Sequence, residues 1–343
     1  VTYVHPEETL MARIELPTGE GPFPVLMAIH GGGFTGGDRT RFQTSFFAYY
    51  TDRGFAVIST EYRLTSEGGA HPEAIKDCLH NLHWLIDHAA EYEFDTSRIV
   101  LQGSSAGSYL AMMLGLTSGL PDFQPDFGPY QGRTAEVKAV ISSAAMYDWT
   151  AITNGTSYIG SYRDDPAASP VNCTAGSACP NYLLLGGDQD WSWSPPPTAE
   201  SMQFNLMADG FYCELYLREG QGHPGFYDDS CAYRVWAFER VEPFLVNRVL
   251  PNTPTRPGDP ARRFRIVSVA PNPFNPTTTF RFILPAATPV TAGIWSATGA
   301  LVRSLAIERP CPPGDNQFTW DGRDGRGLAP VSYTHLRAHE TND

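Results

Sequence analysis

The sequence lacks several features that would assign the protein to a particular class. No run of about 18 or more apolar residues occurs, which argues against a membrane-spanning helix. Residues 1–6 do not have the pattern of a signal peptide, and since the chain does not begin with Met we expect that an upstream segment is missing. Positive charge is scarce: 24 Lys and Arg against 37 Asp and Glu give a net charge of −13. This balance argues against nucleic acid and anionic membranes as partners and suits a neutral substrate.

Metal-binding patterns are also missing, so we expect neither a metal nor a cofactor. The six cysteines, at spacings that match no zinc site, are Cys78, Cys173, Cys179, Cys213, Cys231 and Cys311. Cys173 and Cys179 bracket a five-residue loop, and we predict a disulfide between them, with Cys213–Cys231 as a second candidate pair. The alternative is a set of small buried thiols. His80 and His83 share one expected helix, but no third ligand at a suitable spacing accompanies them.

Residues 1–249 alternate strand-like and helix-like segments, which predicts an α/β fold with a mostly parallel central sheet. The expected strands are 10–16, 25–30, 56–60, 99–102, 137–142, 182–186 and 212–217, and the expected helices are 72–90, 108–116, 198–209 and 228–245. We expect the first strand to be antiparallel and to lie at the sheet edge. A Pro-rich linker follows at 250–262.

The pattern changes after the linker. Residues 263–331 contain short strand-like runs separated by turn residues, which predicts a small all-β sandwich. The expected strands are 264–269, 277–284, 290–295, 301–305 and 316–320.

A nucleophile motif stands between an expected strand and an expected helix. Residues 103–107 are Gly-Ser-Ser-Ala-Gly; they follow the buried-strand-like run 98–102 and precede a helix-like run that begins at Ser108. In a strand, G-x-S-x-G, helix arrangement the serine hydroxyl is held above the sheet edge, in a turn too tight for flanking side chains. About 0.2 such matches are expected by chance, so the motif needs support. It predicts Ser105 as a nucleophile toward ester or amide carbonyls.

A second motif supplies that support. Residues 30–34 are His-Gly-Gly-Gly-Phe and follow the apolar run 25–29. Fewer than about 0.01 such matches are expected by chance. This kind of loop provides backbone N–H groups to an oxyanion hole, together with the residue after the nucleophile. We therefore predict Gly32, Gly33 and Ala106 as the donors, since bare glycine backbone can approach an oxyanion closely.

The acid and the base of a Ser-His-Asp triad are expected downstream, in that order. Asp188 and Asp190 follow the expected strand 182–186, and either can orient a histidine. His223 is the only histidine between these acids and the C-terminal tail, and it lies in a Gly-rich loop. We predict that His223 takes the proton of Ser105 and returns it to the leaving group, while the carboxylate fixes its tautomer.

These segments together resemble the hormone-sensitive-lipase-like carboxylesterases, and within them the small, capless esterases that include acetyl-xylan and feruloyl esterases. The resemblance covers about residues 1–247 and rests on 23–25, 30–34, 61–64, 103–107, 168–171, 187–190 and 222–223. It implies an α/β-hydrolase fold. The family's acid is the second Asp of a G-D-x-D pattern, so the resemblance favours Asp190 over Asp188.

The chain also departs from that family. Ser108 stands where the family usually has Gly, and residues 191–195, Trp-Ser-Trp-Ser-Pro, replace an apolar stretch after the acid. We predict that Phe34, Trp191 and Trp193 line the substrate pocket; loop packing is the alternative role for the two Trp residues. The segment before residue 25 is too short for a large N-terminal cap, and an open site favours bulky or polymer-borne esters.

The resemblance implies a serine carboxylesterase that forms an acyl-enzyme. Its expected substrates are acetyl or feruloyl esters on plant polysaccharide, or short-chain acyl esters generally. One alternative is a serine peptidase of the prolyl-oligopeptidase type, although that group usually has Gly in place of Ser108 and carries a propeller domain. The other is a non-catalytic small-molecule binder on the same scaffold, in which the histidine found here as His223 is lost.

Residues 263–331 resemble the Ig-like domains that end many exported bacterial proteins, including flagellar-hook-cap-like modules and type IX secretion sorting domains. The resemblance rests on 271–278, 297–303 and 319–324. It implies a secreted or cell-surface protein that the secretion machinery engages through this module. Such domains normally end in a Tyr-rich strand. Residues 332–343 instead resemble translated sequencing-adapter read-through of metagenomic reading frames, so we expect a non-native tail and a sandwich without its last strand.

Overall fold

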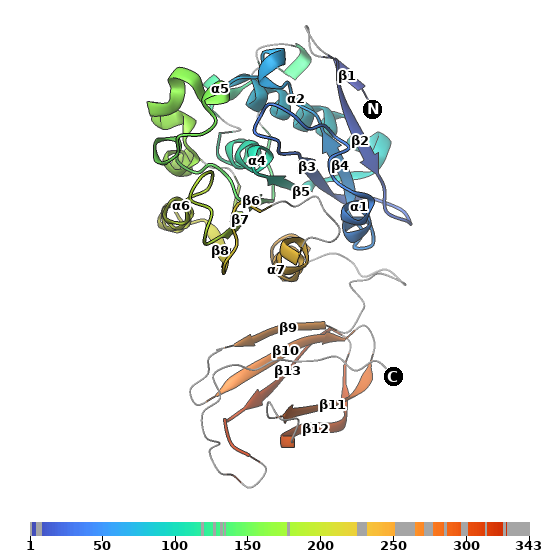
Figure 1. Cartoon of the computed structure of the whole chain (residues 1–343). Helices are drawn as coiled ribbons and strands as arrows, with labels where there is room; N and C mark the ends of the chain where they lie inside the picture. Colours follow the sequence, from blue (N-terminus) through green and yellow to red (C-terminus); the bar gives the residue numbers. More distant parts are fainter. Residues whose placement is uncertain are drawn as a thin grey trace. The chain divides into compact units, whose positions relative to one another are not determined.

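The chain forms two compact units, Val1–Asn252 and Thr253–Asp343 (Figure 1). The computed structural model describes residues 2–4, 9–117, 120–125, 128–130, 133, 135–176, 179–224, 232–250, 265–270, 277–284, 287–295, 301–312, 314–324 and 327. The division between the units falls inside the predicted linker 250–262. That linker beyond Leu250 and the tail 332–343 lie outside the described residues, so the predictions for them stay predictions.

The larger unit is built on an eight-stranded sheet with the order β1-β2-β4-β3-β5-β6-β7-β8. The strands are β1 (Thr2–Val4), β2 (Thr9–Glu15), β3 (Phe23–Ile29), β4 (Ala56–Thr60), β5 (Phe94–Ser104), β6 (Ala139–Ser143), β7 (Asn181–Gly187) and β8 (Tyr212–Arg218). Only the β1–β2 and β2–β4 pairs are antiparallel. The seven expected strands are present. β2 is antiparallel as predicted, but the prediction that it forms the edge is wrong, because β1 pairs outside it.

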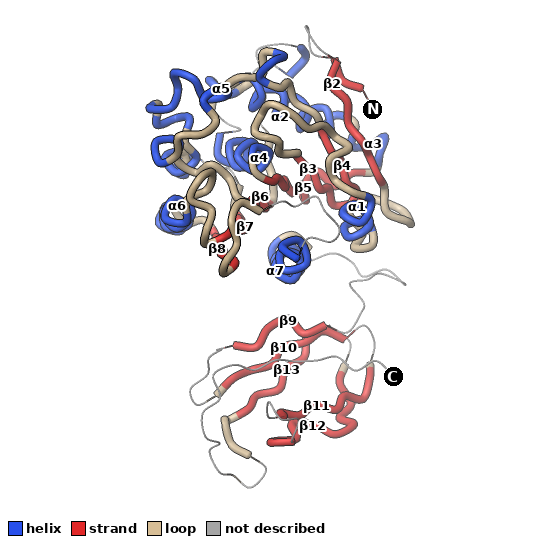
Figure 2. The backbone as a smooth tube through the Cα atoms, in the orientation of Figure 1, coloured by secondary structure: helices blue, strands red, loops and turns tan. Residues whose placement is uncertain are grey.

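Helices cover both faces of this sheet (Figure 2). They are α1 (Thr44–Thr51), α2 (Glu73–Asp87), α3 (Ala89–Tyr92), α4 (Ala106–Thr117), α5 (Thr156–Ile159), α6 (Pro196–Ala208) and α7 (Ala232–Arg248). Successive residues of β3 point to opposite faces: Met27 joins a core with α2, α4 and α6, whereas Leu26 joins a core with α1 and α7. A strand buried on both faces explains the unbroken apolar run that predicted it.

Short 3₁₀ helices occupy several of the connections. They are η1 (Thr65–Glu67), η2 (Pro121–Phe123), η3 (Gly128–Tyr130), η4 (Trp149–Ala151), η5 (Gly160–Asp164), η6 (Pro166–Ala168), η7 (Pro170–Asn172) and η8 (Thr174–Gly176). Five of the eight, η4 to η8, lie between β6 and β7, so the chain that follows the carboxyl end of β6 is compact and irregular.

The smaller unit contains two antiparallel sheets, with the orders β13-β10-β9 and β11-β12. The strands are β9 (Arg265–Ala270), β10 (Thr278–Leu284), β11 (Thr288–Trp295), β12 (Leu301–Cys311) and β13 (Gly314–Trp320). Phe282 of β10, Ala306 of β12 and Phe318 of β13 share one apolar cluster. All five expected strands are therefore present, whereas the Ig-like identity of the unit and its sorting role stay predictions.

The predicted disulfide is wrong. Cys173 and Cys179 are both free thiols, as are the other described cysteines, Cys78, Cys213 and Cys311, while Cys231 lies outside the described residues. The Cys173 thiol donates to the Ala167 carbonyl (3.4 Å) and the Cys179 thiol to the Asn181 carbonyl (3.4 Å). Each thiol is thus turned to a carbonyl of its own segment. Among the described residues, no helix is long and apolar enough to cross a membrane.

Candidate active site

Ser105 occupies the sharp turn between β5 and α4, at the carboxyl end of the parallel strands. Its backbone has a φ of +55°, in the left-handed region that a residue with a side chain seldom adopts. The turn is held from both sides, because the Ser105 N–H donates to the Ser143 carbonyl (2.8 Å) and the Ser105 carbonyl accepts from the Ser108 N–H (2.9 Å). A strained serine fixed in this way projects its hydroxyl beyond the sheet.

The two glycines of the turn are required by close backbone approach. A Cβ on Gly103 would lie 2.1 Å from the Gly107 carbonyl oxygen, and one on Gly107 would lie 2.0 Å from the Ile29 carbonyl oxygen. No side chain fits at such distances. The spacing of glycine around Ser105 is therefore a packing requirement of the strand-to-helix turn, as the sequence motif implies.

His223 joins Ser105 to Asp190 in one hydrogen-bonded chain. The His223 Nε2 lies 2.8 Å from the Ser105 Oγ, and its Nδ1 lies 2.5 Å from the Asp190 Oδ2. With the proton on Nδ1, His223 donates to Asp190 and can accept the serine proton at Nε2. Asp190 is 2% exposed, whereas the His223 side chain is 27% exposed, so the buried carboxylate supports an imidazole that faces solvent. The second Asp of the 187–190 segment makes this contact.

Backbone hydrogen bonds join the loop that carries Asp190 to the loop that carries His223. The Gln189 N–H donates to the Gln221 carbonyl (2.9 Å), and the Asp188 N–H donates to the Arg218 carbonyl (3.1 Å). Gly187 lets the loops meet, since a Cβ there would lie 2.1 Å from the Gln221 carbonyl oxygen. The adjacent strands β7 and β8 thus bring together two residues that are 33 positions apart.

The Gly-rich loop after β3 lies beside this turn, because β3 and β5 are neighbours and Ile29 is paired with Gly103. Gly32 has a φ of +130° and Gly33 a φ of +62°. A Cβ on Gly32 would lie 1.9 Å from the Gly36 carbonyl oxygen, so only glycine fits there. Ala106 is the first residue of α4, where a backbone N–H has no acceptor within the helix. Backbone donors from two segments are therefore available at one edge of the sheet.

His30 anchors the Gly-rich loop from inside the core. It is fully buried, its ring stacks on Tyr62 with centroids 4.4 Å apart, and the Tyr62 hydroxyl donates to the His30 carbonyl (2.9 Å). Burial lowers the pKa of His30, which keeps the imidazole neutral. Its Nδ1 lies 2.9 Å from the Gly31 carbonyl oxygen, so the neutral ring holds the first peptide of the loop.

Comparison with known proteins is consistent with this geometry. Residues 13–182 match the family model BD-FAE. The larger unit is therefore similar to carboxylic ester hydrolases. Lipase 2 of Moraxella sp. (strain TA144) is 39% identical over 90 residues, which cover 26% of this chain and 21% of that protein. The probable carboxylic ester hydrolase LipM of Mycobacterium tuberculosis is 29% identical over 184 residues, which cover 48% of this chain and 41% of that protein. The chain spans less than half the length of these two curated relatives.

Solved structures share the α/β-hydrolase fold. Esterase 2 of Thermogutta terrifontis has a TM-score of 0.61 at 21% identity and covers 74% of this chain and 95% of its own. A truncated carbohydrate esterase from gut microbiota has a TM-score of 0.59 at 22% identity and covers 67% of this chain and 90% of its own. At these identities the similarity shows the fold of the hydrolase unit.

The predicted pocket residues of the hydrolase unit have different environments. Phe34 is fully buried and stacks on Tyr158 with centroids 3.6 Å apart, so the prediction that it lines the pocket is wrong. Its φ of +62° turns the side chain into the core. Trp191 is 62% exposed, and the Trp193 ring lies with its centroid 6.2 Å from that of His223. A pocket role for Trp191 and Trp193 stays a prediction.

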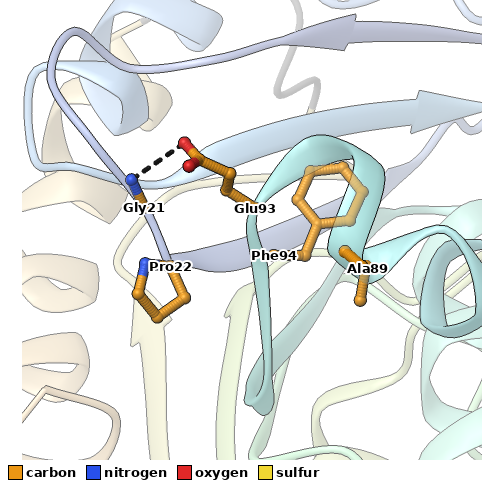
Figure 3. A pocket seen from close by; sticks show the side chains of 6 residues that line it. Gly21, Pro22, Ala89, Glu93 and Phe94 are labelled. Atoms are coloured by element: carbon orange, nitrogen blue, oxygen red, sulfur yellow. Dashed lines mark hydrogen bonds between the residues drawn. The ribbon is translucent and has the colours of Figure 1, made fainter.

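A shallow pocket elsewhere on the unit has no part in this site (Figure 3). It is lined by Gly21, Pro22, Ala89, Ala90, Glu93 and Phe94. Phe94 pairs with Phe23 and Gly103 with Ile29, so six residue steps of β3, about 20 Å at roughly 3.3 Å per residue, separate this pocket from the turn that holds Ser105. Among the described residues, no group of three or more His, Cys, Asp or Glu is arranged to hold a metal ion.

Two supporting contacts were beyond sequence reasoning. The Ser108 hydroxyl, where the resemblance leads one to expect Gly, lies 2.7 Å from the Ser142 hydroxyl, which in turn lies 2.7 Å from that of Tyr147. The Trp193 N–H donates to the second oxygen of Asp190 (3.3 Å). A buried hydroxyl chain and a backbone donor leave no motif in the sequence; the one available signal was the departure from the family at Ser108.

Proposed function

We propose that this chain is a serine carboxylesterase in which Ser105 is the nucleophile, His223 the general base and acid, and Asp190 the residue that orients His223. The observation that carries the proposal is the chain of hydrogen bonds from Ser105 Oγ through both nitrogens of His223 to Asp190. A serine hydroxyl at its ordinary pKa is a weak nucleophile, and an adjacent oriented base is what activates it.

The reaction follows from these positions. Ser105 Oγ attacks the ester carbonyl carbon while His223 Nε2 takes the serine proton. The negative charge that forms on the carbonyl oxygen faces the N–H groups of Gly32, Gly33 and Ala106, which we propose as the oxyanion hole. His223 then gives its proton to the leaving alcohol, and an acyl-enzyme remains on Ser105. Water, deprotonated by His223, attacks the acyl carbon and releases the carboxylic acid, and the proton returns to Ser105.

We propose acetyl or feruloyl esters on plant polysaccharide as the substrate class, with short-chain acyl esters as simpler substrates. The match to the BD-FAE model supports this class, as does the similarity to a carbohydrate esterase from gut microbiota. We further propose that the protein is exported and that its C-terminal unit engages secretion machinery or a surface. The five strands of that unit and the motifs of 271–278 and 319–324 support this part of the proposal.

The test is hydrolysis of p-nitrophenyl acetate, butyrate and octanoate, methyl ferulate and acetylated xylan. We expect Ser105→Ala to lower kcat by a factor on the order of 10⁴ or more, because the nucleophile acts only together with its base. Ser104→Ala is the matched control, since its buried side chain directly precedes the nucleophile, and we expect this variant to keep activity. A folded wild-type protein that hydrolyses none of these esters, or a Ser105→Ala variant as active as wild type, overturns the proposal.

A further inference from the structure

The loop that carries Asp190 also carries two Trp residues, Trp191 and Trp193, on either side of Ser192. Trp191 is 62% exposed, and Trp193 is half-buried against the main core. A single exposed apolar side chain on a protein surface needs no explanation. The position of these two rings calls for an explanation, because they directly follow the carboxylate that orients His223.

Hydrogen bonds fix this loop in place. The Asn154 side-chain amide donates to the Ser192 carbonyl (2.9 Å), between the two rings, and the Trp193 N–H donates to Asp190 (3.3 Å). Asn154 is itself held, since the Arg163 guanidinium donates to its carbonyl (2.9 Å). The two rings are thus attached to a segment that is tied both to the acid and to the chain before α5. A surface prepared in this way loses little conformational freedom when it binds a ligand.

The chemistry of the proposed reaction decides which part of the ester meets these rings. His223 must protonate the oxygen of the leaving alcohol, so the alcohol portion passes beside the imidazole. The Trp193 ring is 6.2 Å from that imidazole, tilted by 43°. The carbonyl oxygen points instead toward the proposed oxyanion hole, the N–H groups of Gly32, Gly33 and Ala106. The Trp side of the site is therefore the alcohol side.

We propose that Trp191 and Trp193 form the subsite for the alcohol portion of the ester, and that this portion is a neutral sugar ring within a polysaccharide. The proposal rests on the proposed function. The apolar C–H face of a sugar ring covers an indole ring, while its hydroxyls stay in contact with water or with polar neighbours. An open platform such as Trp191 also lets a polymer continue past the site. The net charge of −13 disfavours an anionic sugar.

Acetyl esters that differ only in the alcohol test this assignment. We expect Trp191→Ala to lower kcat/KM for an acetylated xylo-oligosaccharide about tenfold more than kcat/KM for ethyl acetate, chiefly through KM. The preference between ethyl acetate and ethyl butyrate, which differ in the acyl group, should stay as in the wild type. Trp191→Phe should restore most of the lost preference. Phe204→Ala is the matched control, because Phe204 is 72% exposed on α6, outside this loop.

A second readout does not need turnover. Xylo-oligosaccharide binding to the Ser105→Ala protein, measured by calorimetry, should weaken about tenfold with Trp191→Ala and stay the same with Phe204→Ala. Equal losses on both alcohols, a changed acyl preference, or binding that is indifferent to Trp191 each overturn the subsite. A wild-type protein that binds the oligosaccharide through Trp191 but hydrolyses no ester overturns the proposed function and leaves the sugar platform standing.

Discussion

Asp190 holds His223 with one carboxylate oxygen and its own loop with the other. Its Oδ2 lies 2.5 Å from the His223 Nδ1, and its Oδ1 accepts the Trp193 N–H at 3.3 Å. A carboxylate anchored at both oxygens cannot rotate away from the imidazole without losing a hydrogen bond. The tautomer with the proton on Nδ1 is thereby favoured, which leaves Nε2 free to accept the Ser105 proton.

Substitution of each aspartate by asparagine shows which of the two, Asp188 or Asp190, acts as the acid of the triad. Asp190→Asn should lower kcat by a factor on the order of 10³ to 10⁴, because an amide stabilises neither the correct tautomer nor the imidazolium. Asp188→Asn is the matched variant in the same loop, and we expect its kcat to stay within a few-fold of wild type. Steady-state kinetics with p-nitrophenyl acetate gives both values. A larger loss of kcat from Asp188→Asn than from Asp190→Asn would show that Asp188, and not Asp190, is the acid of the triad.

Two glycines of the Gly-rich loop should respond in opposite ways to substitution by alanine. Gly32→Ala should abolish activity or solubility, because its Cβ would lie 1.9 Å from the Gly36 carbonyl oxygen and its φ is +130°. Gly36→Ala should fold and remain active, since no atom lies within 4 Å of a Cβ at that position. Thermal unfolding together with esterase activity distinguishes the two. Equal behaviour of the two variants would contradict the conformation of this loop.

The features that were predictable from the sequence are those imposed by local packing. Gly103 and Gly107 stand where backbone atoms approach within about 2 Å of a Cβ, so the turn around Ser105 leaves its mark in consecutive residues. The buried strands are likewise recognisable in the sequence, because each one, such as β3, is an unbroken apolar run. The order nucleophile, acid, histidine then led to His223 and to Asp188 or Asp190, and only the family resemblance favoured Asp190.

Two of the errors originate in side-chain direction. Phe34 follows the Gly-rich loop, but its positive φ sends the ring into the core, which the motif does not encode. Cys173 and Cys179 have a disulfide-like spacing, yet their thiols face separate carbonyls. Helix α1 was not predicted because its aromatic residues have low helix propensity; burial of Phe46 and Tyr50 against the sheet outweighs that preference.

His71 makes stability depend on pH. Burial lowers its pKa from 6.5 to about 4, and it lies edge-on to Tyr158 in a buried aromatic cluster. Because the folded-state pKa is below that of the unfolded chain, the unfolded chain binds the proton first as the pH falls. Neutral His71 therefore contributes its full share of the unfolding free energy above pH 6.5. As the pH falls from 6.5 to 4, about 3 kcal/mol of that free energy is lost.

Urea unfolding at several pH values measures this dependence. His71→Gln should flatten the decline of the unfolding free energy between pH 6.5 and 4 relative to wild type, because glutamine does not titrate. Buried His30 and His83, whose pKa values are also lowered by burial, leave a residual slope in both proteins. A variant with an unchanged slope would contradict the account of His71.

The described cysteines should behave as buried thiols. Burial raises the pKa of Cys173 to about 11 and that of Cys179 to about 12, so neither forms an appreciable thiolate at neutral pH. Dithiothreitol should leave the Tm unchanged. At least the five described thiols should react with Ellman's reagent once the protein is unfolded without reductant. A Tm that falls with dithiothreitol, or fewer than five reactive thiols, would show that the protein contains a disulfide.

The most direct test of the central claim is covalent labelling of the native protein with a fluorophosphonate, followed by peptide mapping by mass spectrometry. An activated serine attacks phosphorus, the P–F bond breaks and fluoride leaves, and the phosphonyl group stays on the serine oxygen. The account therefore predicts one adduct, on Ser105, whose formation is lost in His223→Ala. Ser104 and Ser108, on either side of the turn, serve as internal controls within the same peptide. No adduct on a folded protein, or an adduct on a different serine, would contradict the assignment of Ser105 as the nucleophile.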